Sequence, residues 1–273
     1  MRMLRLLQFL LIGLALADTG AAAQGHKVEV LWLGHAAFRI ATPGGKVIVI
    51  DPALSAIPAT PPEYKNLEAL GKVDLLLVTH GHWDHITDGP ALAKLNKIPM
   101  YAPGDLNMAL TTLGVLPPAQ LPRSNKSGRV APVPGIKLTL THAEHSSVYV
   151  WRNPVTNKDE THPGGEPVGF IIELENGFRI WHMGDTGVFG DMKLIAEMYK
   201  PDLVLMPIGG GQFVMNPVDA AMATRELIKP KAVIPMHYLT TPLLPGTPAE
   251  YIKALGSSST KVLAIQPGEM VEF

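Results

Sequence analysis

The chain has 273 residues, of which 23 are Lys or Arg and 24 are Asp or Glu, so its formal net charge is -1. It has no cysteine, which excludes disulfide bonds, a thiolate nucleophile and thiolate metal ligands. The charge balance gives no basic footprint for nucleic acid, so we expect a small-molecule substrate and no nucleic-acid partner. The length is sufficient for one large domain.

Residues 1–23 have the layout of a cleaved secretory signal peptide. A basic start, MRMLR, precedes the apolar segment Leu6–Ala17, which is shorter than the roughly 20 residues that span a bilayer. A-x-A patterns end at Ala17 and at Ala23, and both are candidates for the last residue of the signal. We therefore expect a secreted, periplasmic protein with no membrane span in its mature part, residues 24–273. An uncleaved membrane anchor is the alternative.

The first part of the mature chain predicts short strands. Residues 28–42 and 46–51 are expected as strands joined by a turn at Pro43-Gly44-Gly45. An apolar strand over 73–80 precedes an expected helix over 86–96 and a short strand over 99–102. The Pro-rich segment 113–134 predicts a loop. Further antiparallel strands are expected over 136–141, 148–151, 168–174 and 178–183.

The second part alternates helices and strands. Helical spacing is present over 192–199, 218–228 and 249–255, and apolar strands are expected over 202–208, 231–238 and 260–265. Hairpins followed by alternating helices and strands predict an α/β domain over residues 24–273, with two sheets and helices packed outside them. The segments expected as binding loops carry no pattern that identifies a substrate; they are 52–62, 113–134, 151–166 and 238–248.

The segment LLLVTHGHWDHITD, Leu75–Asp88, concentrates ionisable side chains at the end of an apolar strand. His80 and His82 are two residues apart and can converge on one cation, whereas Asp84 and His85 are adjacent and can turn toward a second. Imidazole and carboxylate groups are ligands for zinc and similar divalent metals. A bound cation would also explain why such groups are crowded together, because burying them without a partner is unfavourable. A single strand-end His is commonly a capped or solvent-facing residue, but four ligand-type residues in six positions favour a metal site.

The pattern H-x-H-x-D-H resembles the signature of the metallo-β-lactamase superfamily. WLGHAAF, IDPALS, GGEPVGFII, WHMGDTGVFGDMK, KPDLVLMPIGGG and IKPKAVIPMHY extend the likeness along nearly the whole mature chain. Together they resemble the metal-dependent hydrolase branch that is similar to ascorbate-6-phosphate lactonase-like proteins. The resemblance implies a four-layer αβ/βα sandwich, the metallo-β-lactamase fold, with metals at one edge of the two sheets.

The resemblance also implies the remaining ligands. A third His for the first metal is expected in THAEHSS, where His145 is preferred and His142 is the alternative. Asp185 in the G-D-T turn is expected to bridge two metals, and His237 in IPMHY to complete the second site. The implied cofactor is two divalent ions, Zn first, with Mn or Fe as alternatives.

Three further residues are expected near these ligands. Asp51 is expected to support the site by accepting a hydrogen bond from a ligand His. His35 and His182 are candidates for contacts behind the ligands or with substrate, and a purely structural role is the other interpretation. The run Gly209-Gly210-Gly211 is either an anion cradle or a flexible loop.

The resulting hypothesis is an exported metal-dependent hydrolase that attacks a lactone, ester or phosphodiester bond with a metal-activated hydroxide. Asp84 is the expected catalytic residue, since it would orient the nucleophile as well as bind metal. Other members of the metallo-β-lactamase superfamily carry Arg directly after this Asp. His85 at that position favours a site of the thioesterase, lactonase or phosphodiesterase type. The alternatives are a periplasmic metal-binding protein without turnover and a phosphodiesterase or nuclease of the same fold. The sequence gives no oligomeric state.

Overall fold

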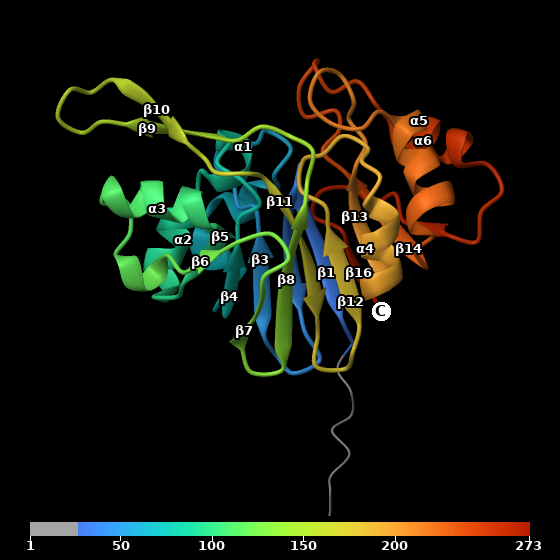
Figure 1. The fold of residues 1–273 in the computed structure, drawn as a ribbon, viewed down its shortest axis with the longest axis horizontal. Helices are drawn as coiled ribbons and strands as arrows, with labels where there is room; N and C mark the ends of the chain where they lie inside the picture. Colours follow the sequence, from blue (N-terminus) through green and yellow to red (C-terminus); the bar gives the residue numbers. More distant parts are fainter. Residues whose placement is uncertain (1–26) are drawn as a thin grey trace, which may run out of the picture.

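The computed structural model describes residues 27–273, so the predicted signal peptide, residues 1–23, lies outside the described residues. Two seven-stranded sheets form the centre of the molecule (Figure 1). The first sheet contains, in spatial order, β16 (Met270–Glu272), β1 (Glu29–Gly34), β2 (Ala37–Ala41), β3 (Val47–Ile50), β4 (Leu75–Leu77), β5 (Met100–Pro103) and β6 (Arg123–Ser124). The second contains β15 (Lys261–Val262), β14 (Ala232–Met236), β13 (Leu203–Pro207), β12 (Arg179–His182), β11 (Val168–Glu173), β8 (Ile136–His142) and β7 (Arg129–Val133).

Strands of the first sheet are apolar on both faces because each face packs on a different layer. In β1, Val30 and Trp32 enter the cluster shared with the second sheet, whereas Leu31 and Leu33 enter a separate cluster on the outer side. Successive side chains of a strand point to opposite faces, so a continuous apolar run fills two cores. The outer cluster also contains Leu92 and Leu106, which come from helices that cover this sheet.

Helices lie outside both sheets and produce four layers (Figure 1). Those at the first sheet are α1 (Trp83–Ile86), α2 (Gly89–Asn96) and α3 (Gly104–Thr112). Those at the second are α4 (Met192–Tyr199), α5 (Pro217–Met222), the π-helical segment η4 (Ala223–Ile228) and α6 (Pro248–Leu255). Short 3-10 turns occupy Pro62–Lys65, Leu67–Leu70 and Pro118–Gln120. The expected αβ/βα sandwich is confirmed. Within residues 27–273, none of the helices has the length and apolar character needed to cross a bilayer.

The strands that precede the candidate site residues end at one edge of the two sheets. β3 pairs in parallel with β4, and β12, β13 and β14 form a parallel set. Parallel strands present their carboxyl ends at the same edge, where α/β folds place functional groups. The segments after these strands are therefore brought together near α1, at the top of the sheets in Figure 1.

Several predicted elements in the first part of the chain were wrong. The expected strand over 28–42 is a hairpin of β1 and β2, because His35 adopts a left-handed backbone (φ 55°) between them. The expected helix over 86–96 is present as α2 over Gly89–Asn96, but Ile86 ends the separate short helix α1. The expected loop over 113–134 contains β6 and β7, and helix α3 was missed. These edge strands and α3 have weak periodicity, so tertiary packing decides their structure.

Two corrections concern exposed or short strands in the rest of the chain. The expected loop over 151–166 contains β10 (Asp159–Pro163), which pairs with β9 (Val148–Arg152) in a two-stranded hairpin that projects from the body (Figure 1). None of the residues of β10 is fully buried, so burial imposes no apolar pattern on its sequence. The expected strand over 260–265 is ordered as strand only at Lys261–Val262, and the final strand β16 was not expected. The helix over 192–199 was predicted with its observed bounds.

Candidate metal centre

The first group of candidate ligands is formed by His80, His82 and His145. One ring nitrogen from each lies within 4.8 Å of the others. His80 Nε2 and His82 Nδ1 are 2.9 Å apart, and the ring of His145 lies 5.2 Å from the rings of both. His142, the alternative to His145, does not join the group, because its ring nitrogens face Lys126 Nζ at 3.2 Å and Glu144 Oε2 at 3.3 Å. The fold thus brings the preferred candidate to the group.

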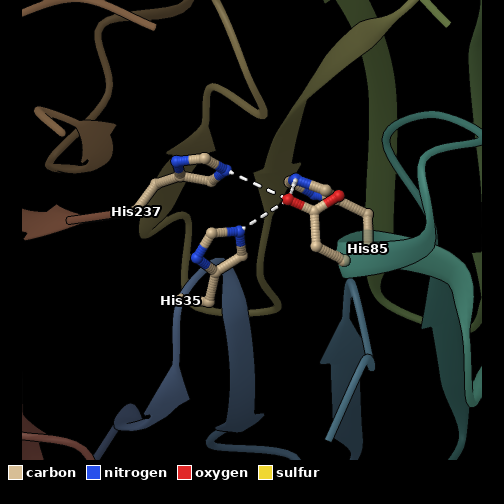
Figure 2. A group of neighbouring side chains, drawn as sticks. His35, His85 and His237 are labelled. Atoms are coloured by element: carbon tan, nitrogen blue, oxygen red, sulfur yellow. Dashed lines mark hydrogen bonds and ion pairs between the residues drawn. The ribbon is translucent and has the colours of Figure 1, made fainter. Parts of the chain in front are cut away.

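The second group is formed by Asp84, His85 and His237, with His35 beside them. Figure 2 shows His35, His85 and His237 turning ring nitrogens toward one carboxylate. This carboxylate is Asp84, whose Oδ2 lies 2.9 Å from His35 Nε2, 3.7 Å from His237 Nε2 and 3.9 Å from His85 Nε2. His35 also stacks on His237, with ring centroids 3.7 Å apart. His35, for which the sequence left the role open, is thus part of this group's surroundings.

Asp185 lies between the two groups. Its Oδ1 is 3.2 Å from His85 Nε2, and its Oδ2 is 3.0 Å from His237 Nε2 and 3.5 Å from His145 Nε2. Its side chain is buried. One carboxylate thus faces histidines of both groups, the arrangement that the sequence interpretation requires of a bridging ligand.

The chemistry of these atoms fits divalent cations. His85 Nε2, Asp185 Oδ1 and both ring nitrogens of His237 are buried and make no hydrogen bond of acceptable geometry, although they face one another at short distances. Buried polar atoms are normally satisfied, and exceptions point to a missing partner such as an ion. A cation that accepts lone pairs from nitrogen and oxygen would satisfy His85 Nε2, Asp185 Oδ1 and His237 Nε2 at once.

The pKa values differ between the two groups. Burial lowers the pKa of His80, and the positive charge of His85 lowers it further, so the imidazole is neutral and free to coordinate. Burial and the neighbouring His145 likewise lower the pKa of His82. Burial also acts to lower the pKa of His237, but the Asp185 carboxylate outweighs it and raises this pKa to about 8. Cation binding at the second group must therefore displace a proton from His237.

The carboxylates stay charged. Burial acts to raise the pKa of Asp185, but the adjacent His237 and His85 hold it well below its ordinary value. Burial acts in the same direction on Asp84, and His85 and His237 again lower its pKa below the usual range. Both side chains are therefore available as anionic ligands at neutral pH.

Asp51 braces His85 from behind. Its Oδ2 lies 2.8 Å from His85 Nδ1, and it accepts hydrogen bonds of 2.7 Å from the backbone N–H and the hydroxyl of Thr79. A carboxylate on Nδ1 holds the tautomer that leaves Nε2 with a free lone pair. His182 differs, since its Nε2 lies 2.9 Å from the Ala36 carbonyl and its Nδ1 accepts from the Gly184 N–H. It braces two turns and is fully buried, which favours its structural interpretation.

We expect Asp51→Asn to lower the metal affinity of the protein by roughly 10–100-fold, the usual effect of losing a group that orients a ligand. The amide removes the negative charge that holds His85 Nδ1–H, while its size is unchanged. Competition between the protein and a chromophoric chelator measures the affinity. Asp88→Asn is the matched control, because the side chain of Asp88 accepts hydrogen bonds from Ser55 and lies outside the ligand groups. An unchanged affinity in Asp51→Asn would remove Asp51 from the site.

The glycine run 209–211 packs closely against neighbouring backbone. A Cβ on Gly209 would collide with the backbone carbonyl of His237, and a Cβ on Gly211, where φ is +63°, would collide with that of Leu243. The N–H of Gly210 is already bonded to the Met215 carbonyl. The run therefore packs the segment after β13 closely against the segment that carries His237.

Gly209→Ala is accordingly expected to destabilise the protein by about 1–3 kcal/mol or more, because a rigid backbone carbonyl must move to accommodate the methyl group. Urea denaturation measures the difference. Gly190→Ala is the control, since a Cβ there meets open space at an ordinary φ, and its stability should be unchanged or slightly higher. Equal stabilities of the two variants would contradict the close packing of the run.

The fold and this site together define a class of protein, the metal-dependent hydrolases. Residues 46–238 match the model of the beta-lactamase superfamily domain, and the chain belongs to this family. It is a metal-dependent hydrolase with the metallo-β-lactamase fold. The narrower likeness to ascorbate-phosphate lactonases remains a prediction.

Individual relatives carry the same description. A UPF0173 metal-dependent hydrolase of Polaromonas sp. is 69% identical over 247 residues, covering 90% of each chain. Another, from Cupriavidus necator, is 60% identical and covers 90% of this chain and 86% of its own. Among solved structures, the metallo hydrolase Igni18 of Ignicoccus hospitalis is 32% identical with a TM-score of 0.76, over 91% of this chain and 99% of that one. YhfI of Bacillus subtilis shares the fold with a TM-score of 0.66 at 13% identity, over 90% of this chain and 99% of its own.

Proposed function

We propose that this hydrolase uses two divalent ions to cleave a lactone, ester or phosphodiester bond. The observation that carries the proposal is Asp185, whose two oxygens face histidines of both ligand groups. His80, His82 and His145 would hold one ion, Asp84, His85 and His237 the other, and Asp185 both. His and carboxylate ligands suit Zn, with Mn or Fe as alternatives.

The ions, when bound, supply a water of lowered pKa and polarise the oxygen of the scissile bond. The protein's own contribution is positional. Asp84 is partly exposed at the cavity and fixed by His35, so its carboxylate is placed to orient the attacking water. His35 is in turn held by Thr240, whose Oγ1 lies 2.8 Å from His35 Nδ1. Such a chain of contacts limits the orientations of the reacting groups, which lowers the entropy cost of reaction.

A hydrolysis panel tests this function. The purified protein is reconstituted with Zn or Mn and offered a lactone, a thioester, an aryl phosphodiester and a β-lactam, with His82→Ala beside it. We expect turnover of one bond class that is lost on chelation and in His82→Ala. Cleavage of the phosphodiester alone, with strongly salt-dependent binding of substrate, would identify a phosphodiesterase of this fold. Activity that survives in His82→Ala would contradict the proposed site.

Export is the second part of the proposal. Its support is the sequence of residues 1–23, with a basic start, a short apolar segment and small residues before Ala17 and Ala23. We expect the protein in the periplasmic fraction, with a mature chain that begins after one of these two alanines. Intact mass spectrometry of the fractionated protein distinguishes the two cleavage points, and a full-length cytoplasmic product would contradict export.

A further inference from the structure

A cavity of about 360 Å³ opens over the candidate metal centre. Its floor includes Asp84, Asp185 and His237. Its volume is near the lower end of the roughly 300–1,000 Å³ of small-molecule sites. The site residues thus open into a space suited to a small substrate.

The walls of this cavity are mostly apolar and come from four separate segments. They are Ile57, Pro58, Trp83, Phe213, Leu243 and Leu244. Ile57 and Leu244 are buried, whereas Trp83 is 54%, Phe213 41% and Leu243 57% exposed. Large apolar side chains gathered in a partly exposed group mark a binding surface, whereas single ones do not. The other polar lining groups outside the candidate ligands are His35 and the hydroxyls of Thr240 and Thr241.

The segments around the cavity carry no cationic side chain. Residues 51–60, 79–90, 142–151, 183–192, 208–224 and 237–252 contain neither Lys nor Arg, although they contain several Asp and Glu. Proteins that recognise phosphate or carboxylate groups normally pair them with Arg or Lys. Burying an anionic substituent against these walls would leave its charge unpaired, which is costly. The cavity therefore disfavours a substrate that carries a negative charge away from the reacting group.

The apolar wall is held in place. The N–H of Gly246 donates to the Gly209 carbonyl, and the N–H of Leu239 donates to the Leu244 carbonyl. The absent side chain of Gly211 leaves room for the carbonyl of Leu243. A wall that is already fixed by backbone contacts needs no ordering when substrate binds, which increases the affinity of the cavity.

We propose that the substrate is a small carboxylic ester or lactone whose acyl group is uncharged and apolar, and that Trp83, Phe213 and Leu243 bind this group. The inference rests on the proposed function, since it names the substrate class of the same site. In the reaction, a water oxygen bonds to the carbonyl carbon and the acyl carbon–oxygen bond breaks. One proton of the water ends on the leaving alkoxide and the other is lost to solvent from the new acid, which leaves a carboxylate and an alcohol, joined in one molecule when the substrate is a lactone.

The decisive comparison uses 4-nitrophenyl butyrate and 4-nitrophenyl hemisuccinate, which differ only in a terminal methyl or carboxylate. We expect the metal-loaded protein to favour the butyrate in kcat/KM by roughly tenfold or more, because the carboxylate finds no cation. Leu243→Lys places a cation at this wall and should bring the ratio toward one. Leu194→Lys, at a similarly exposed leucine on α4, should leave the ratio unchanged.

A binding readout does not depend on turnover. Butyranilide and succinanilic acid are the matching amides, and Trp83 fluorescence in the metal-loaded protein reports their binding. We expect a response to the neutral amide at roughly tenfold lower concentration, lost in Trp83→Phe.

Failure of the substrate inference and failure of the proposed function give different experimental results. Equal or faster hydrolysis of the hemisuccinate overturns the inference and leaves the hydrolase proposal intact. Cleavage of bis-4-nitrophenyl phosphate with no ester cleavage also overturns the substrate class alone. No turnover of any ester, lactone, thioester, phosphodiester or β-lactam by the loaded protein overturns the proposed function itself.

Discussion

Asp185→Asn is expected to lower kcat/KM by roughly 10³-fold or more, at least the loss that follows removal of one stabilising group from an active site. The substitution preserves shape but removes the charge and one of the two oxygens that face His85, His145 and His237. An amide nitrogen in that place donates rather than accepts, so it opposes a cation. Steady-state kinetics on the preferred substrate, together with the metal content by elemental analysis, measure the effect.

Asp191→Asn is the matched control for this experiment. Asp191 lies six residues further along the chain but is exposed and is not one of the candidate ligands. It should keep wild-type kinetics and metal content. Wild-type metal content and activity in Asp185→Asn would show that this carboxylate does not bridge the ions, and the two-ion proposal would then fail.

Removal of metal is expected to lower the melting temperature of the protein by about 5–10 °C for each site lost. Free metal at about 100 times Kd stabilises the folded state by about 2.7 kcal/mol per site, and 1 kcal/mol corresponds to about 2–4 °C in a domain of this size. The reason is that His85 Nε2, Asp185 Oδ1 and His237 Nε2 have no other hydrogen-bonding partner. Calorimetry of chelator-treated and zinc-loaded protein measures the shift.

Two histidine variants show in the same thermal measurement which histidine is the third ligand of the first group. His145→Ala should lose part of the zinc-dependent shift, because its ring belongs to the first group. His142→Ala should retain the whole shift, because its ring faces Lys126 and Glu144 instead. The opposite result would reverse the assignment of the third ligand of the first group. A zinc-independent melting temperature in the wild-type protein would contradict a specific metal site in the fold.

The local sequence was sufficient to predict the structure where a single short segment contains all the residues concerned. His80, His82, Asp84 and His85 lie within six positions after a buried strand, so their proximity needs no tertiary information. The strand at Leu203–Pro207 was predictable because it is a continuous buried apolar run, and the helix at Met192–Tyr199 because Met192, Ile195 and Ala196 are buried at helical spacing.

Local sequence was insufficient where packing rather than periodicity orders the chain. Helix α3 begins with Gly104 and contains Asn107 and two threonines, which are poor helix formers. It is ordered because Leu106 and Leu110 enter the outer core, while the amide of Asn107 donates to the carbonyls of Met100 and Pro122. Strand β9 was predicted, but its partner β10 was missed for the converse reason, since none of its residues is fully buried and its sequence, DETHP, has no apolar alternation.

The sequence by itself determined the class of this protein, because the ligand cluster is local and the family motifs run along the chain. Only the tertiary structure separated His145 from His142, placed His35 on Asp84 and His237, and turned His182 away into a structural role. It alone assembled the apolar cavity, whose walls lie more than a hundred residues apart in sequence, from Ile57 to Leu244. The physical reason is that periodicity reports whether a side chain is buried, whereas the packing of the two sheets decides which buried side chains meet.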